Sequence, residues 1–317
     1  AALTPGKVRG LSATATSEGV FTILAIDHRD SLRIVLEPDA PDDIPASVLT
    51  AAKLDLIRGL GEAASAVMLD PEYSAAQSIV ARALPGHTGF LVAIEAQGYL
   101  GDPAATRTTL LEGWSVAKAR RLGAEGIKLL VLYRPDGGAV SEAQERLIAD
   151  VVADCALHDI PLFLEPLLYE RPDGGIDRRA LVVESVRRLG ALGPDVLKVQ
   201  FPLDTRAQPD RAAWRDACAE LDDAAPVPWA LLSAGGSFGQ FRDQLEIACA
   251  SGASGFMVGR ALWSDYVTAQ PAARQDLLRD SLRPRFSELS TVAREHGRDW
   301  AARHRLSTID ERWYATY

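Results

Sequence analysis

The sequence predicts an α/β protein of the (β/α)8 TIM-barrel class, and three observations support this prediction. Short β-rich apolar runs alternate with longer amphipathic stretches, which is typical of βα units and a parallel sheet. Eight such runs occur, and their C-terminal ends are about 33 residues apart, enough for one strand, one crossover helix and two loops. A charged segment follows the first run where a dinucleotide-binding fold would have a glycine-rich loop.

The eight predicted strands are mostly continuous apolar runs, as expected for strands that are covered on both faces. They are residues 21–27, 66–70, 90–95, 126–132, 161–165, 195–201, 229–233 and 255–259. Eight units is the number that closes a barrel. An open doubly wound sheet could also hold eight strands, but its phosphate loop normally follows the first strand, where Asp27, His28 and Arg29 stand here.

The stretches between the strands are predicted as helices. In the first, apolar residues recur every three or four positions, at Leu49, Ala52, Leu56 and Leu60. Ser74 is a candidate N-cap, and residues 141–158 and 177–189 have helical period and length. The Pro- and Asp-rich residues 37–45 are predicted as a long first βα loop. No linker or repeat divides the sequence, so residues 1–317 are predicted as a single barrel domain with a C-terminal helical extension.

Charge, hydropathy and cysteine content exclude several classes of protein. The formal net charge of −9 argues against a nucleic-acid or anionic-membrane partner, so a few local cations must hold any anionic substrate. No apolar run reaches the roughly 18 residues of a membrane span, and the first residues lack the apolar core of a secretory signal. Cys155, Cys218 and Cys249 fit neither a disulfide framework nor a zinc motif. We therefore expect a cytoplasmic protein.

Polar residues gather at the predicted C-terminal ends of the strands, where barrel enzymes build their sites. They are Asp27, His28, Arg29, Asp70, Glu95, Lys128, Glu165, Lys198, Ser233, Gly235, Gly236, Gly259 and Arg260. Charged side chains are costly to bury without a partner, so each needs a counter-ion or a function. Asp70 is predicted to end its strand and cap the next helix.

Lys198 is the most informative of these residues, because Leu197 and Val199 flank it in a central strand. It is either a salt-bridged core lysine or a desolvated amine that forms a Schiff base with a carbonyl substrate. Lys128 puts a second ammonium group in the same lumen, and their mutual repulsion helps one of them to lose its proton. The pair favours catalysis.

The carboxylates near these lysines have two interpretations. Glu165 and Glu95 are counter-ions of the lysines or general acid/base groups, and one residue can be both. Asp27 either holds a substrate hydroxyl or pairs with a lysine.

The loops after the seventh and eighth strands predict a phosphate site. Ser233, Gly235 and Gly236 precede a helix, so backbone N–H groups there can hold an anion, and Arg260 adds a local cation. Of the five histidines only His28 lies at a strand end, and none has metal-ligand spacing, so no metal is expected.

Several motifs in fixed order resemble those of class I aldolases, in the branch of tagatose-1,6-bisphosphate and sulfofructose-1-phosphate aldolases. The motifs are residues 21–32, 95–99, 126–136, 161–169, 195–202, 232–236 and 258–263. The resemblance implies a (β/α)8 barrel, no metal or other cofactor, and retro-aldol cleavage of a sugar phosphate to dihydroxyacetone phosphate and an aldehyde.

The resemblance also implies roles for individual residues. Lys198 matches the Schiff-base lysine, Lys128 the second active-site lysine, and Glu165 the acid/base glutamate. Asp27 matches a substrate-contacting aspartate. Further substrate or phosphate contacts are expected from His28, Arg29, Glu95, Gln97, Ser233, Gly235, Gly236, Gly259 and Arg260.

Two departures from the family pattern leave the distal group of the substrate open. His28 stands where the family usually has glutamine, and Ala96 and Gln97 stand where the bisphosphate branch tends to read Lys-Thr. The alternatives are an aldolase for another sugar phosphate, such as a sulfosugar or deoxysugar phosphate, and a phosphosugar-binding barrel without chemistry. A homo-oligomer is expected, with Trp313, Tyr314 and Tyr317 available for a subunit contact.

Overall fold

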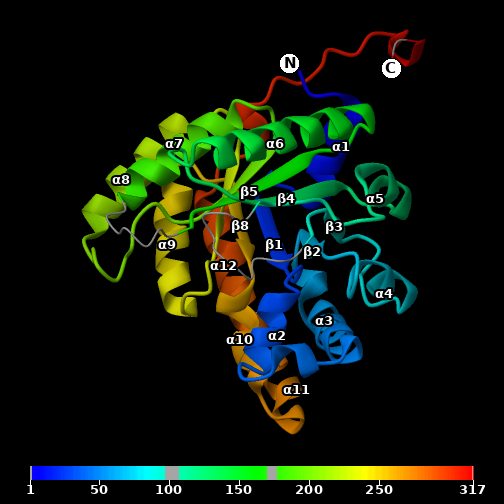
Figure 1. The fold of residues 1–317 in the computed structure, drawn as a ribbon, viewed down its shortest axis with the longest axis vertical. Helices are drawn as coiled ribbons and strands as arrows, with labels where there is room; N and C mark the ends of the chain where they lie inside the picture. Colours follow the sequence, from blue (N-terminus) through cyan, green and yellow to red (C-terminus); the bar gives the residue numbers. More distant parts are fainter. Residues whose placement is uncertain (1, 97–106, 170–176, 316) are drawn as a thin grey trace.

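The computed structural model describes residues 2–96, 107–169, 177–315 and 317. Eight parallel strands pair in chain order, and β8 pairs with β1, so the sheet closes into a barrel (Figure 1). The strands are β1 Phe21–Ala25, β2 Ala66–Leu69, β3 Gly89–Ala93, β4 Gly126–Leu132, β5 Leu162–Leu167, β6 Val196–Val199, β7 Trp229–Leu232 and β8 Gly255–Val258. The predicted (β/α)8 class is confirmed.

Most predicted strands run one or two residues too far at their C-terminal ends. Asp27, Asp70 and Glu95 follow β1, β2 and β3 rather than ending them. These side chains therefore lie in the loops directly above the barrel, where sites of this fold are built. In contrast, β5 continues through Pro166 to Leu167, so Glu165 lies inside its strand.

Alternate residues of each strand pack into two separate cores, as the period of two requires. The barrel lumen holds one cluster, which contains Phe21, Ile23, Ala25, Ala66, Met68, Leu91, Phe163, Val196, Ala230 and Met257. The intervening residues, such as Leu24, Val67 and Leu129, pack against the helices. Lys128 and Lys198 lie on the inward phase of β4 and β6, because each contacts side chains from strands on the far side of the lumen.

Helices surround the barrel and connect its strands (Figure 1). They are α1 Pro5–Thr14, α2 Asp30–Leu36, α3 Ala46–Leu60, α4 Ala75–Val80, α5 Val116–Leu122, α6 Ala139–Leu157, α7 Arg178–Gly190, α8 Arg211–Ala224, α9 Phe238–Ala250, α10 Arg260–Thr268, α11 Arg274–Leu277 and α12 Arg283–His296. The predicted helices 141–158 and 177–189 agree with α6 and α7 to within two residues.

The first βα connection is more ordered than predicted. The short helix α2 directly precedes residues 37–45, and these residues contain the 3-10 turn Pro41–Asp43. Burial of Leu32 against the main core stabilises α2, a tertiary contact that local sequence does not reveal. Ser74 is the N-cap residue of α4, as predicted, but its hydroxyl bonds to Asp70 instead of a helix amide.

The chain termini close the barrel end opposite the predicted site. Leu3, Leu11 of α1 and Trp300 belong to the lumen cluster and pack beneath β1. Leu3 also forms a β-bridge with Leu306, so the N-terminal residues lie beside the segment that precedes the C-terminal tail. Within the described residues, no helix is long and apolar enough to cross a membrane. The three cysteines are buried and unpaired.

Candidate active site

A cavity of about 310 Å³ lies at the C-terminal ends of the strands. The predicted site residues that line it are His28, Glu165, Lys198, Ser233, Gly235, Gly259 and Arg260. Asp30, Ser31 and Ile34 of α2 form part of its wall, together with apolar side chains such as Leu130, Leu167 and Met257. The structure thus brings residues from six strands and their loops to one cavity.

Lys198 projects from β6 into this cavity and is 5% exposed. Its Nζ lies 2.8 Å from Oε2 of Glu165 and 3.7 Å from Sδ of Met68. A carboxylate on one side and a thioether on another hold the amine, while the apolar cavity wall limits its access to water. The arrangement suits a lysine that must react with a carbonyl group.

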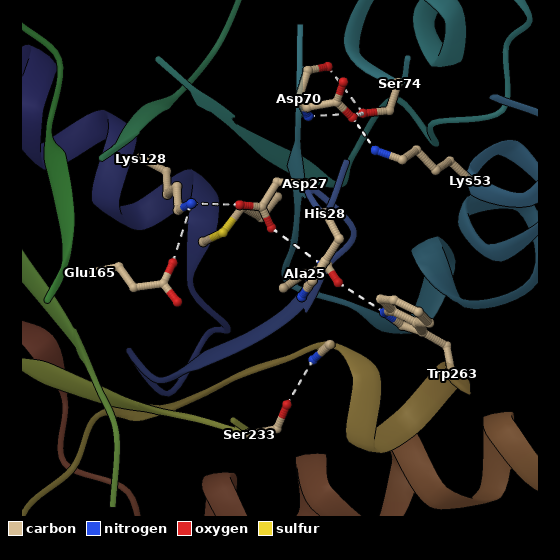
Figure 2. Close-up of polar contacts among 12 residues, drawn as sticks. Ala25, Asp27, His28, Lys53, Asp70, Ser74, Lys128, Glu165, Ser233 and Trp263 are labelled. Carbon is tan, nitrogen blue, oxygen red and sulfur yellow. Dashed lines mark hydrogen bonds and ion pairs between the residues drawn. The ribbon is translucent and has the colours of Figure 1, made fainter. Parts of the chain in front are cut away.

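Lys128 lies behind the cavity and contacts three carboxylates, two of which, Asp27 and Glu165, are shown in Figure 2. Its Nζ lies 2.7 Å from Oδ2 of Asp27, 2.5 Å from Oε1 of Glu95 and 3.3 Å from Oε2 of Glu165. Glu95 also accepts a hydrogen bond from the backbone N–H of Leu130. All three carboxylates therefore act as counter-ions, and Glu165 alone contacts both lysines.

Asp27 is buried, and this burial by itself would raise the pKa of its carboxyl group. The ammonium groups of Lys128 and Lys198 outweigh that effect and hold the pKa well below its usual range. Asp27 is therefore a carboxylate throughout the physiological pH range. Its Oδ2 contacts Lys128, but its Oδ1 is buried and has no hydrogen-bond partner among the described residues.

His28 forms the cavity wall next to Asp27 (Figure 2). Burial lowers the pKa of His28 to about 3, against the opposing effect of Asp27, so the imidazole is neutral at pH 7. Its Nδ1 lies 3.8 Å from Oδ1 of Asp27, and it too has no hydrogen-bond partner in the described part of the chain. The ring packs edge-on against Trp263, whose indole N–H donates to the carbonyl of Ala25.

The loops after β7 and β8 form a polar cradle at the other side of Lys198. The hydroxyl of Ser233 accepts a hydrogen bond from the backbone N–H of Gly259 at 3.3 Å, which joins the two loops (Figure 2). Ala234 and Gly235 both have left-handed backbone angles, with φ of 45° and 77°. The tight turn leads to Ser237, which caps α9 by accepting from the N–H of Gln240.

Arg260 supplies the positive charge of this cradle. It is the first residue of α10, and a Cβ atom placed on Gly235 would lie 3.3 Å from its Cζ. The guanidinium therefore packs directly on Gly235, with the N-terminal ends of α9 and α10 beside it. Helix N-termini and a guanidinium together favour a phosphate group.

The remaining predicted residues lie outside the cavity lining. Asp27 and Glu95 contact Lys128 behind it, and Arg29 is buried against Glu72 and the carbonyl of Glu95, both at 2.6 Å. Gly236 lines a neighbouring depression of about 330 Å³ that shares Ser233 and Gly235 with the main cavity. Gln97 lies outside the described residues. Substrate contacts for these five residues stay predictions.

Sequence reasoning missed a second buried ion pair next to the site. Lys53 of α3 is 1% exposed and pairs with Asp70, whose carboxylate also accepts from Ser74 (Figure 2). Instead of capping α4, Asp70 bonds the N–H groups of Glu72 and Tyr73 in the preceding turn. The helical period of the sequence does indicate that Lys53 is buried, because Lys53 lies on the same face of α3 as the buried Leu49, Leu56 and Leu60.

Burial lowers the pKa of Lys53, and the Asp70 carboxylate opposes this shift. Among the described residues, no group of three or more His, Cys, Asp and Glu side chains could hold a metal ion.

Similar proteins agree with this architecture. A tagatose 1,6-diphosphate aldolase of Streptococcus mutans is 28% identical over 95% of this chain and 99% of the relative. A tagatose 1,6-diphosphate aldolase of Listeria monocytogenes is 29% identical over 90% of each chain. An archaeal fructose-1,6-bisphosphate aldolase has a similar fold, with a TM-score of 0.63, 18% identity, and coverage of 90% of this chain and 98% of the other.

The family model of DeoC/LacD aldolases matches residues 21–265, which span the barrel from the start of β1 into α10. This match confirms the predicted resemblance to aldolases and makes the protein an enzyme of the lyase class. The chain belongs to the DeoC/LacD family of aldolases.

Proposed function

We propose that the protein is a class I aldolase that cleaves a ketose phosphate to dihydroxyacetone phosphate and an aldehyde, with a Schiff base on Lys198. The observation that carries the proposal is the buried Lys198 amine, 2.8 Å from Glu165 in a cavity that also holds Arg260. Tagatose or fructose 1,6-bisphosphate and 6-sulfofructose 1-phosphate are the candidate substrates. The named activities of the Streptococcus and Listeria relatives support a bisphosphate.

Binding begins at the phosphate of the dihydroxyacetone half. Arg260 and the loop of Ser233 and Gly235 hold this group, which orients the ketone of the substrate toward Lys198. His28 lines another wall, with Asp27 behind it, and Oδ1 of Asp27 lies 3.8 Å from Nδ1 of His28; neither atom has a hydrogen-bond partner among the described residues. One substrate hydroxyl can donate to the carboxylate and accept from the imidazole.

Schiff-base formation uses the lysine pair and Glu165. The Lys198 nitrogen bonds to the ketone carbon, the C=O π electrons move to oxygen, and the nitrogen passes a proton to Glu165. Glu165 returns this proton to the oxyanion, which becomes the carbinolamine hydroxyl. The hydroxyl leaves as water when it gains one further proton, which the Lys128 ammonium, 3.3 Å from Glu165, is placed to supply.

Cleavage of the C3–C4 bond follows from the positive iminium. A carboxylate, Glu165 or Asp27, accepts the proton of the C4 hydroxyl, the aldehyde forms, and the bond electrons move through C3 to the iminium nitrogen. Protonation of the resulting enamine at C3 and hydrolysis release dihydroxyacetone phosphate and restore Lys198. The archaeal aldolase of similar fold was solved with its catalytic lysine bound to a carbinolamine intermediate, which supports this route.

The remaining expectations belong to the same proposal. The cytoplasmic enzyme would act as a homo-oligomer of single-domain chains and need no cofactor beyond its own lysine. The aromatic residues near the C-terminus support a subunit contact, since the side chain of Tyr314 is 69% exposed and that of Tyr317 is 63% exposed. Sedimentation of the full chain beside a Trp313→Ser, Tyr314→Ser variant tests the contact, and identical association states would contradict it.

Borohydride trapping tests the chemistry. Wild-type enzyme incubated with dihydroxyacetone phosphate and sodium borohydride should gain one adduct per chain, and peptide mass spectrometry should place it on Lys198. Lys198→Arg keeps the charge and should lose both trapping and cleavage, whereas Lys118→Arg, at an exposed position of α5, should keep both. Full cleavage by the Lys198→Arg variant, insensitive to EDTA, would overturn the mechanism.

A panel of ketose phosphates then identifies the distal group. Turnover of 1,6-bisphosphates, 6-sulfofructose 1-phosphate and a 6-deoxyketose 1-phosphate should differ by orders of magnitude in kcat/KM. Tight binding of sugar phosphates without trapping or turnover would identify a binding protein instead.

A further inference from the structure

The thioether of Met68 contacts Lys198 across the barrel lumen. Met68 belongs to β2 and Lys198 to β6, two strands that are not neighbours, yet Sδ and Nζ are 3.7 Å apart. Met68 is fully buried in the lumen cluster, and its backbone pairs with Ala25 of β1 and Leu91 of β3, so strand pairing fixes the backbone and close packing restricts the side chain. The Lys198 amine therefore has two hydrogen-bond acceptors, the uncharged thioether of Met68 and the carboxylate of Glu165.

A neutral lysine amine has two N–H bonds and one lone pair besides its bond to Cε. Glu165 accepts one N–H of Lys198, and Met68 accepts the other. When both are engaged, the lone pair occupies the one tetrahedral direction that remains. Lys198 itself lines the cavity, so the free direction is available to a bound carbonyl carbon.

We propose that Met68 is a positioning residue that aims the lone pair of Lys198 at the substrate ketone. The proposal rests on the proposed function of Lys198 as the nucleophile. Attack joins the nitrogen to the carbonyl carbon, moves the C=O π electrons to oxygen and transfers one N–H proton to Glu165. Met68 gains and loses no atom in this step, and its sulfur contacts the amine that attacks.

The chemistry of sulfur explains why a thioether suits this place. A thioether is a weak, polarisable and uncharged acceptor, whereas a second carboxylate beside the amine would stabilise the unreactive ammonium form. An aliphatic side chain would fill the same volume but leave the second N–H without an acceptor in a buried site. A misaligned nucleophile loses rate even when the substrate binds equally well.

Met257 provides a matched control within the same lumen. The sequence has two methionines, and Met257 of β8 also points inward, is 1% exposed and lines the cavity. In the described part of the chain, Met68 is the methionine whose sulfur accepts from Lys198. A role in packing alone predicts similar losses of rate from both methionines, whereas a role in aiming the amine predicts a clearly larger loss from Met68.

The experiment measures the first-order rate of borohydride-trappable iminium formation with saturating dihydroxyacetone phosphate. Met68→Leu should slow this step roughly five- to tenfold, as expected for loss of one hydrogen bond that orients a nucleophile, with the KM for phosphate substrate unchanged. Met257→Leu alters the cavity wall but removes no acceptor from Lys198, so it should slow this step less than Met68→Leu does.

Norleucine has a methylene group in place of the methionine sulfur and otherwise the same shape. It therefore distinguishes the effect of the hydrogen bond to Lys198 from the effect of side-chain packing. In the Met257→Leu background, incorporation of norleucine at position 68 should slow the step as Met68→Leu does, and incorporation of selenomethionine should keep the rate of the Met257→Leu enzyme. Unchanged rates with norleucine, or equal losses from both methionine sites, would overturn the role of Met68. Wild-type enzyme that gives no adduct on Lys198 would instead overturn the proposed function itself.

Discussion

Oε2 of Glu165 lies 2.8 Å from Nζ of Lys198, and the same oxygen lies 3.3 Å from Nζ of Lys128. One carboxylate oxygen thus connects the amine in the cavity to the amine behind it. Because β5 continues past Glu165 to Leu167, a strand backbone rather than a loop fixes this side chain. The geometry gives protons a direct path between the two lysines.

Glu165→Gln should lower kcat by about 10²- to 10⁴-fold, the usual contribution of a general acid/base group. The amide keeps the shape of the side chain but cannot exchange a proton with Lys198. Steady-state kinetics and borohydride trapping measure the loss. Glu145→Gln, which changes a carboxylate bonded to Tyr133 and Arg188, should leave kcat within a few-fold of wild type. A fully active Glu165→Gln enzyme would remove Glu165 from the mechanism.

Gly259→Ala should impair the enzyme by displacing His28. A Cβ atom on Gly259 would lie 2.6 Å from Cε1 of His28 and 3.3 Å from the carbonyl oxygen of Ala25, and Trp263 packs against the same ring. Such overpacking costs roughly 1–3 kcal/mol, so kcat/KM should fall about tenfold or more. In a double-mutant cycle, Gly259→Ala should cost much less in a His28→Ala background. Equal losses in both backgrounds would show that the glycine acts elsewhere.

The barrel and its two lysines could be predicted because their signals are local. Continuous apolar runs at regular spacing define the strands, and a lysine within such a run must face the lumen or a helix layer. The partners of Lys128 could not be predicted, since Glu165 lies within β5 and Asp27 and Glu95 lie in the loops after β1 and β3, and they meet only when the barrel closes. Pairing of Arg29 with Glu72 likewise depends on two loops 43 residues apart.

The short helix α2 could not be predicted from the sequence either. The seven residues of α2 are too few to form a stable helix alone, and contacts with the core stabilise it. As a result, the contributions of Asp30, Ser31 and Ile34 to the cavity wall were missed.

Arg260→Ala should raise the KM for a phosphorylated substrate roughly 10- to 100-fold, because charge-assisted hydrogen bonds to phosphate are worth about 1.5–3 kcal/mol each. The kcat value should change less, since Arg260 lies at the phosphate end of the site. Competitive inhibition by inorganic phosphate should weaken in parallel. Arg279→Ala, at an exposed arginine paired with Asp276 and Asp280, provides the control. An unaltered KM would place the phosphate elsewhere.

His28→Gln should change how stability depends on pH. The pKa of His28 is about 3 in the folded protein and near 6.5 in the unfolded chain, so between these values the unfolded chain binds more protons. The wild type therefore loses stability as pH falls from 6.5 toward 3, and glutamine removes this loss. Between pH 7.5 and 5, the unfolding free energy of the variant should gain about 1–2 kcal/mol over wild type. Urea titrations at each pH measure the unfolding free energy. If the free energies of wild type and variant changed with pH in parallel, the imidazole of His28 would not be a neutral buried group.

Lys53→Met should destabilise the fold more than any change at an exposed lysine. Lys53 is 1% exposed and Asp70 is fully buried, so the variant leaves the Asp70 carboxylate in the interior with two backbone N–H groups and the Ser74 hydroxyl as partners. Removal of one member of a buried ion pair typically costs about 3–5 kcal/mol. Lys53→Met, Asp70→Asn should recover part of this loss because the uncompensated charge disappears, although the turn before α4 keeps a weaker acceptor. Guanidinium unfolding of both variants, with exposed Lys118→Met as control, measures these differences. A loss below 1 kcal/mol in Lys53→Met, or a double variant less stable than the single, would show that the pair contributes little to the fold.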